Sequence, residues 1–153
     1  MTSIDREKEV FIPWKNEYLV GIPIIDEQHK ILIELANDLY DSCRDGRSSA
    51  ADGFRRAVHA VVNYVKVHFS TEEKIMERVN FPEALEHRNE HKEFVQQVLL
   101  EVKNFESGKR FAYYGFLNYL RDWTLNHIAH TDRFMVDYVL KLAKQGLLNH
   151  HNP

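Results

Sequence analysis

Two pairs of potential metal ligands lie four residues apart between positions 68 and 91. His68 precedes Glu72 by four residues, and His87 precedes His91 by four. Residues at this spacing lie on the same face of a helix. Imidazole nitrogen and carboxylate oxygen together suit transition metals such as iron, zinc and manganese. The spacing therefore indicates two metal-binding helix faces close together in the chain.

The nine histidines include two further candidates, His29 and His127, each beside apolar residues of a predicted helix. A single histidine on an apolar face is usually an ordinary core or surface residue. Burying five histidines and a glutamate without partners is a different matter, since each unpaired polar group costs about 1–3 kcal/mol. Cys43 is remote from the set, and the lack of sulfur argues against a structural zinc site. Five histidines are too many for one ion with an open position, so two ions that share carboxylates fit better.

Four stretches with apolar residues at helical spacing must position these ligands. We expect helices from Pro23 to about residue 43, from 50 to 79, from 83 to 105 and from 111 to 142. Gly46 and Ser48 or Ser49 are predicted to separate the first two, and Pro82 to end the second. The apolar stripes are Ile25, Leu32, Leu35, Ala36, Leu39; Phe54, Val58, Val61, Val62, Val65, Phe69, Ile75, Met76; Leu85, Phe94, Val95, Val98, Leu99, Val102; and Phe116, Leu117, Leu120, Trp123, Leu125, Ile128, Phe134, Met135, Tyr138.

Four long helices joined by short loops predict an all-α fold, an up-down-up-down antiparallel four-helix bundle with an N-terminal non-helical arm. The 153 residues are expected to form one domain, with the arm at 1–22, the bundle at about 23–143 and a fraying tail at 144–153. His29 and His87 come early in their helices, whereas His68 and His127 come late. Alternating helix direction brings all of them toward one end of the bundle.

Composition narrows the class of protein. The chain is 44% hydrophobic and 28% charged, with a net charge of −3, and no run of Lys or Arg indicates a nucleic-acid partner. We see no signal peptide and no apolar run long enough for a membrane span. The single cysteine, Cys43, excludes a disulfide framework and favours a reducing compartment, so we expect a cytoplasmic protein. We also expect a monomer.

Several motifs in fixed order are similar to those of a known family. They are "IDEQH" at 25–29, "HFSTEE" at 68–73, "FP" at 81–82, "HRNEHKEF" at 87–94 and "WTLNHIAHTD" at 123–132, preceded by "PWKNEYLVGIPIID" at 13–26. Over residues 11–140 the sequence resembles the bacterial hemerythrins. The resemblance implies a cofactor of two Fe ions, cycling between Fe2+ and Fe3+ with an oxo or hydroxo bridge.

The resemblance also implies a role for each ligand. His87, His91 and His127 would fill one iron, while His29 and His68 would hold the other, which keeps an open position for O2. Glu72 and Asp132 would be the bridging carboxylates. Asp132 did not follow from spacing, because residues 127 and 132 lie ~140° apart on an ideal helix. Either the helix is locally distorted there or Asp132 reaches across.

We expect the O2 pocket to be lined by Trp123, Thr124 and Ile128. The family often has a large aliphatic residue where this chain has Thr124. A hydroxyl there would make the pocket wetter and oxidation by air faster. The alternative is that Thr124 turns away and bonds the carbonyl four residues earlier.

The remaining polar residues of the region are not expected to bind metal. We interpret Glu73, Glu77, Glu86 and Glu90 as a solvated face, and His59 as facing away from the site. His130 lies at the edge of the site, within reach of the ligands. His150 and His151 are expected to be solvated in the tail.

The function predicted from these residues is reversible O2 binding, for transport, storage or delivery to an oxygen-using enzyme. The alternatives are O2 or redox sensing and a peroxidase-type di-iron enzyme. Ferritin-like oxidases use Glu-x-x-His pairs, and none occurs in this sequence. We therefore expect a carrier rather than an enzyme, with peroxidase chemistry only as a weak side activity.

Overall fold

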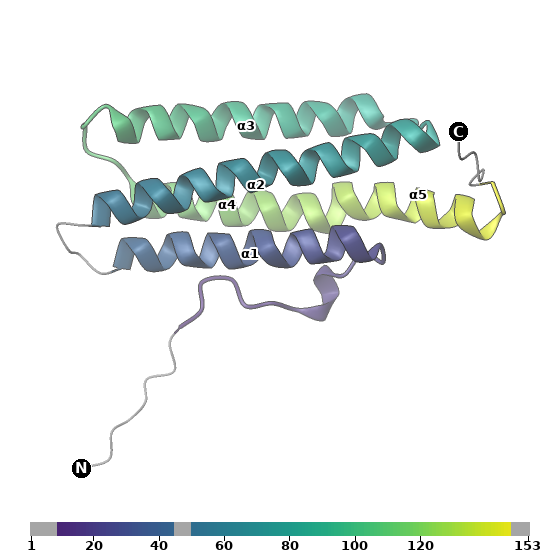
Figure 1. Ribbon diagram of the computed structural model, residues 1–153, viewed down its shortest axis with the longest axis horizontal. Coiled ribbons are helices and arrows are strands. Elements are labelled where there is room, and N and C mark those ends of the chain that lie inside the picture. Colours follow the sequence, from purple (N-terminus) through teal and green to yellow (C-terminus); the bar gives the residue numbers. More distant parts are fainter. Residues whose placement is uncertain (1–8, 45–49, 148–153) are drawn as a thin grey trace, which may run out of the picture.

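The computed structural model describes residues 9–44 and 50–147, and within these ranges four helical rods pack as an antiparallel bundle (Figure 1). The rods are α1 (Pro23–Arg44), α2 (Ala50–Val79), α3 (Ala84–Glu106) and a fourth made of α4 (Tyr113–Asn126), a π-helical turn (His127–Asp132) and α5 (Arg133–Lys144). The predicted up-down-up-down bundle is confirmed. The predicted breaks at Gly46 and at Ser48 or Ser49 lie outside the described residues, as do His150 and His151.

The turn between α2 and α3 is closed by backbone geometry. Asn80 takes a left-handed φ of 51°, and the Phe81 N–H donates to the Met76 carbonyl at 2.9 Å. This bond spans five residues, as in the Schellman motif that ends many helices. α2 therefore stops just before Pro82, and α3 turns back along it only a few residues before His87.

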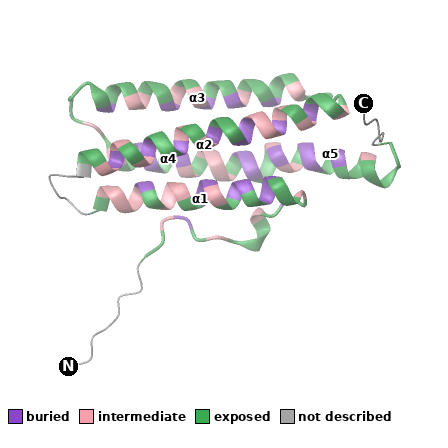
Figure 2. Cartoon of the chain, in the orientation of Figure 1, coloured by how far each residue is buried: buried purple, intermediate pink, exposed green. Residues whose placement is uncertain are grey.

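Buried residues line the inner faces of the helices, as the purple bands in Figure 2 show. They form two apolar clusters, one including Leu32, Phe69 and Leu120, the other Ile25, Met76 and Met135. Along α1, α2 and the fourth rod, the predicted ligands come between a residue of one cluster and a residue of the other. The two apolar clusters thus flank the predicted ligands along the bundle axis and fix their position along it.

Three residues predicted for the apolar stripes are exposed instead. Leu85, Leu99 and Phe134 have exposed fractions of 67%, 46% and 56%. Leu99 follows the buried Val98, and one step along a helix turns a side chain by ~100° away from the core face. Phe134 leans on the Phe81 ring, with ring centroids 5.9 Å apart, rather than entering the core.

The N-terminal arm lies along α1 and is held by hydrogen bonds to helix residues. It is not wholly non-helical as predicted, because Asn16–Tyr18 form one 3-10 turn. The buried carboxylate of Asp26 accepts the N–H groups of Val20 (2.7 Å) and Gly21 (3.1 Å). Gly21 has a φ of +108°, which side chains rarely adopt, and an added Cβ would come within 3.3 Å of a Leu140 methyl.

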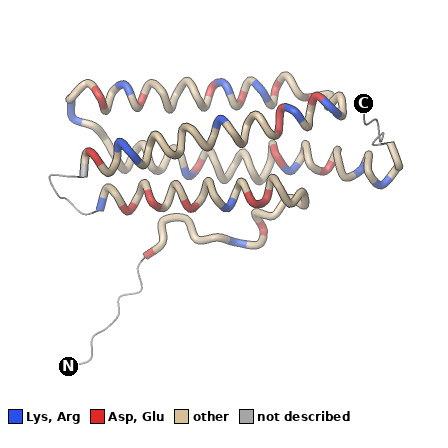
Figure 3. Tube along the Cα trace, viewed as in Figure 1, with Lys and Arg blue, Asp and Glu red and all other residues tan. Residues whose placement is uncertain are grey.

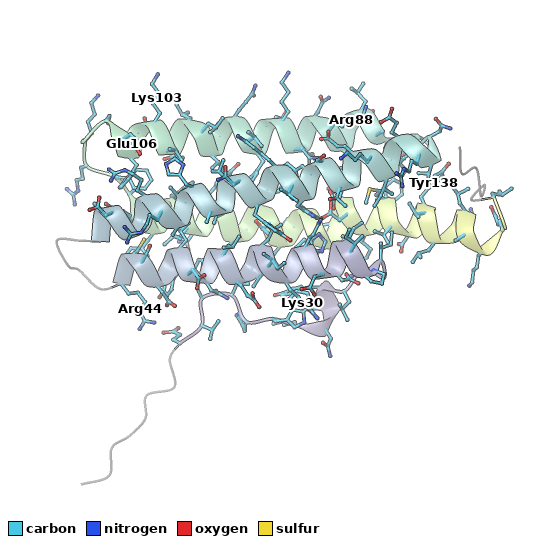
Figure 4. The ribbon with its side chains drawn as sticks, in the orientation of Figure 1. Lys30, Arg44, Arg88, Lys103, Glu106 and Tyr138 are labelled. Carbon is cyan, nitrogen blue, oxygen red and sulfur yellow. The ribbon has the colours of Figure 1, made fainter. Side chains whose placement is uncertain are left out.

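Two cations reinforce the position of the arm. The guanidinium of Arg133, the residue after the π-helical turn, donates to the Glu17 carbonyl (2.8 Å) and the Leu19 carbonyl (3.1 Å). Lys30, labelled on α1 beside the arm in Figure 4, has its ammonium 5.3 Å from the centroid of the Trp14 ring. The arm is therefore attached both to the helix that carries His29 and to the rod that carries Asp132.

Surface charges of both signs are interspersed along all the helices, as Figure 3 shows. In the described part of the chain, no helix combines the length and apolar character that a membrane span requires.

Candidate metal centre

The π-helical turn brings His127 and Asp132 together. In this turn hydrogen bonds join residues five apart, so residues at that spacing stack as residues four apart do in an α-helix. The Nε2 of His127 lies 2.9 Å from Oδ1 of Asp132. Local distortion of the helix, one of the two explanations left open by the sequence, is the one that the structure adopts.

All seven predicted ligands come together in the interior. They are buried, with exposed fractions from 0% to 4%, and the Nε2 atoms of the five histidines point at the two carboxylates; the seven are His29, His68, Glu72, His87, His91, His127 and Asp132. Two of the histidine nitrogens, Nε2 of His91 and Nε2 of His127, are 3.2 Å apart, close enough to share a proton or to bind one cation together.

Each carboxylate divides its two oxygens between two sets of histidines. Glu72 Oε1 lies 3.1 Å from Nε2 of His68, whereas Glu72 Oε2 lies 3.1 Å from Nε2 of both His87 and His91. Asp132 Oδ2 lies 3.0 Å from Nε2 of His29, whereas its Oδ1 faces His87 and His127 at 3.2 and 2.9 Å. A carboxylate with one oxygen toward each set has the arrangement of a bridge between two ions.

The donor atoms form two overlapping groups, and the described residues contain no other group of this kind. One group offers five donors, from three histidines and both carboxylates, and we call it the five-donor position. The other offers four, from His29, His68 and the same carboxylates, and we call it the four-donor position. The donors within each group lie within 4.8 Å of one another. Nitrogen and oxygen donors without sulfur fit iron, manganese or zinc.

Electrostatics makes this cluster a cation site. Burial works against ionised carboxylates, but the nearby histidines outweigh it and hold the pKa of Glu72 and of Asp132 well below their ordinary values. Burial likewise opposes charge on His68 and His87, but the two carboxylates raise the pKa of each to about 9. Without metal, protons would have to supply the positive charge that the buried carboxylates require.

The outward-facing Nδ1 atoms of His68, His91 and His127 have hydrogen-bond partners, and two of these partners are glutamates. His91 Nδ1–H donates to Glu73 Oε1 at 3.0 Å, and His127 Nδ1–H donates to Glu90 Oε2 at 2.8 Å. The interpretation of Glu73 and Glu90 as merely a solvated face is therefore wrong. Each is part-exposed but orients a predicted ligand, since a donor at Nδ1 leaves the Nε2 lone pair directed inward.

Gln28 was not recognised from the sequence, although it contacts the site directly. It is 7% exposed, and its Oε1 accepts the Nδ1–H of His68 at 2.9 Å. The sequence offered one indication of this role: Gln28 directly precedes His29, on a helix that was already predicted to carry a metal ligand on its inner face. His130, expected within reach of the ligands, is exposed, although it lines a surface pocket with His87 and Glu90. His59 is exposed, as predicted.

A mostly apolar cavity of about 30 Å3 adjoins one side of the cluster. Trp123, Thr124 and Ile128 line it, together with both histidines of the four-donor position, His127 of the five-donor position and the shared Asp132. The rest of its wall is apolar: Leu32, Ala36, Val61, Val65, Phe69, Phe94 and Leu120. Trp123 stacks on His127 with ring centroids 4.3 Å apart. The alternative for Thr124 does not occur: among the described residues its hydroxyl makes no bond to the Leu120 carbonyl, and Thr124 lines the cavity instead.

The fold and this cluster define a four-helix-bundle protein with a buried histidine and carboxylate site able to hold metal. The sequence pattern of the Hemerythrin HHE cation binding domain matches residues 20–139. The chain belongs to the hemerythrin family.

Relatives agree with this assignment, and solved structures agree with the fold. Proteins named bacteriohemerythrin from Stenotrophomonas maltophilia and Pseudomonas aeruginosa are 29% and 30% identical, over 91% and 82% of this chain and 88% and 80% of their own. A crystal structure of wild-type hemerythrin has a TM-score of 0.74 at 25% identity, covering 81% of this chain and 94% of that one. A leucine-to-alanine mutant of hemerythrin has a TM-score of 0.76 at 24% identity and covers 82% and 95%.

Proposed function

We propose that this protein binds dioxygen reversibly at a di-iron centre held by the seven buried residues. His87, His91 and His127 would hold the iron in the five-donor position, and His29 and His68 the iron in the four-donor position, with Glu72 and Asp132 shared. The proposal rests on one observation above all: the apolar cavity is lined by both histidines of the four-donor position, but by only one histidine, His127, of the five-donor position. A small apolar molecule in the cavity would lie beside the position with fewer protein donors.

A pair of iron ions would supply the two electrons that dioxygen takes up on binding and recover them on release. The chain contributes a fixed charge environment and exclusion of water. Two carboxylates offset much of the charge of two cations, which is important because isolated charge is costly in a low-dielectric interior. Apolar side chains such as Leu32, Val65 and Phe94 surround the cavity and limit access of the protons that would make oxidation irreversible.

The histidine-rich donor set favours binding over oxygen activation. Ferritin-like di-iron proteins place Glu-x-x-His pairs on their helices, whereas this site has five histidines and two carboxylates. We further propose transport, storage or delivery of O2 to an oxygen-using enzyme in a reducing cell compartment. Sensing and peroxidase chemistry are the competing functions. An O2 carrier returns to its reduced form when O2 leaves, whereas a sensor or a peroxidase needs a reductant to do so.

The test is an optical spectrum of iron-loaded, reduced protein before air, after air and after return to argon. We expect visible charge-transfer bands that appear with O2 and disappear when it is removed, over repeated cycles. A spectrum that needs a chemical reductant to reset would refute the carrier function. Asp132→Asn, which removes a shared carboxylate charge, is the matched variant and should lose the reversible bands.

A further inference from the structure

The hydrogen-bond partners outside the cluster differ in charge between the two metal positions. In the five-donor position, His91 and His127 donate to the carboxylates of Glu73 and Glu90, at 3.0 and 2.8 Å. In the four-donor position, His68 donates to the neutral amide of Gln28 at 2.9 Å. These hydrogen bonds therefore bring negative charge to the five-donor position and none to the four-donor position.

The orientation of the Gln28 amide is set by a chain of hydrogen bonds across α1 and α2. The Thr71 hydroxyl donates its proton to the Val67 carbonyl at 3.1 Å, so its oxygen can only accept from Gln28. The Gln28 Nε2–H donates to that oxygen at 2.9 Å, which leaves Oε1 directed at Nδ1 of His68. An acceptor at this point requires a proton on Nδ1, and the lone pair of His68 then lies on Nε2, facing the cluster.

A ligand histidine becomes a stronger donor when its other nitrogen donates to a carboxylate, and the amide of glutamine has a weaker effect. We propose that Gln28 is a positioning residue that orients His68 while keeping the four-donor position electron-poor, and that Glu73 and Glu90 strengthen metal binding at the five-donor position. This proposal rests on the proposed two-metal site. If it is correct, the metal in the four-donor position, beside the cavity, binds more weakly and is more electrophilic than the metal in the five-donor position.

Because Gln28 is buried, a change of charge at residue 28 should affect metal binding more than the same change at Glu73 or Glu90. Its side chain lies in the interior, whereas the side chains of Glu73 and Glu90 are 37% and 46% exposed, so water screens their charge. A second contact compensates in part for Glu90, since the Thr131 hydroxyl donates to the same oxygen at 2.7 Å. A charge introduced at residue 28 should therefore act more strongly than one removed at residue 73 or 90.

The experiment is a titration of metal-free protein with Co2+, followed by calorimetry and by the visible absorption of bound cobalt. The full chain should bind two ions with distinct affinities. Gln28→Ala should weaken the second binding step by about 10- to 100-fold, the usual effect of removing such a partner, and leave the first step unchanged. Gln28→Glu, which keeps the shape and adds a charge, should tighten the second step by roughly tenfold.

Variants of other residues distinguish a loss of His68 orientation from a general disturbance of the fold. Thr71→Val removes the support of the amide and should weaken the second step in the same direction as Gln28→Ala, but less. Glu90→Gln should weaken the first step instead. Gln96→Glu and Glu34→Gln, the same chemical changes at exposed positions, should alter neither step. Circular dichroism would check that each variant keeps its helical content.

The opposite effects of Gln28→Ala and Gln28→Glu carry the test, because damage to the fold could not tighten binding. In iron-loaded protein, a tenfold change in preference for Fe3+ over Fe2+ would move the one-electron potential by about 59 mV, toward lower values for Gln28→Glu. Equal Co2+ affinities in both variants, or fewer than two bound ions in the unaltered protein, would overturn the proposal. Two bound ions with the expected shifts but no reversible O2 spectrum would refute the proposed function and leave this inference standing.

Discussion

Replacing Thr124 by valine should slow the oxidation of the reduced protein in air. Valine is close to threonine in shape, so the change removes a hydroxyl from the cavity wall and leaves the volume nearly unaltered. In the described residues the Thr124 hydroxyl has no protein partner for a hydrogen bond. It is therefore free to bind water next to the four-donor position.

The size of the effect follows from the cavity and from one hydrogen bond. A cavity of about 30 Å3 has room for a water molecule, which needs ~10–15 Å3 and at least two polar partners. Losing one such bond costs about 0.5–1.5 kcal/mol, which is a two- to tenfold fall in water occupancy. If water delivers the proton that makes oxidation irreversible, the rate should fall by the same factor.

The assay follows the decay of the O2-dependent absorption of iron-loaded protein at constant oxygen and pH. Thr124→Ser keeps the hydroxyl and should oxidise at least as fast as the unaltered protein. Urea denaturation of both variants would show that stability is unchanged within about 1 kcal/mol. Equal oxidation rates for Thr124→Val and the unaltered protein would refute the reasoning, because the hydroxyl of the cavity wall would then have no effect on oxidation.

Three further predictions concern metal, pH and the arm. Asp132→Asn should reduce the bound Co2+ below two ions per chain, measured by calorimetry, and full retention would contradict the bridging role. His68 and His87 have folded-state pKa values of about 9, above the unfolded value near 6.5, so they bind extra protons in the folded state. The free energy of unfolding of the metal-free protein should therefore fall as pH rises from 6.5 through 9, and a flat profile in urea titrations would count against this. Asp26→Ala leaves two arm amides without their acceptor and should cost ~1–3 kcal/mol in urea, whereas Glu27→Ala, at an exposed position, should cost little.

The sequence predicted the helices and the level of the site because both depend on local periodicity. Apolar residues at helical spacing locate the rods, and short connections make neighbours antiparallel, which brings His29, His68, His87 and His127 to one end. The periodicity of one helix does not show which part-exposed carboxylates accept a hydrogen bond from a histidine of a neighbouring helix. Glu73 and Glu90 have the composition of a solvated face, and their role depends on the distance to another helix.

The π-helical turn explains why Phe134, which was predicted for the apolar stripe of the fourth rod, is exposed. Continuing the regular pattern of Leu117, Leu120 and Ile128 would bury positions 131, 134, 135 and 138. The residues that are buried are each one position later, namely Asp132, Met135, Val136 and Val139. The turn thus shifts the inner face of α5 by one residue, which leaves Phe134 exposed. Apolar residues occur in both registers, so composition could not distinguish them.

The same shift decides which side chain completes the cluster. A regular helix would bring Thr131 to the position one turn after His127, and a hydroxyl has no charge to offer a pair of cations. In the structure Thr131 instead donates to Glu90, the acceptor of the His127 Nδ1–H, and Asp132 takes the inner position. One extra residue in the turn therefore supplies a second shared carboxylate and a support for a histidine at once. A helix distortion is a common mark of functional sites, and here its benefit is the charge that a two-metal site requires.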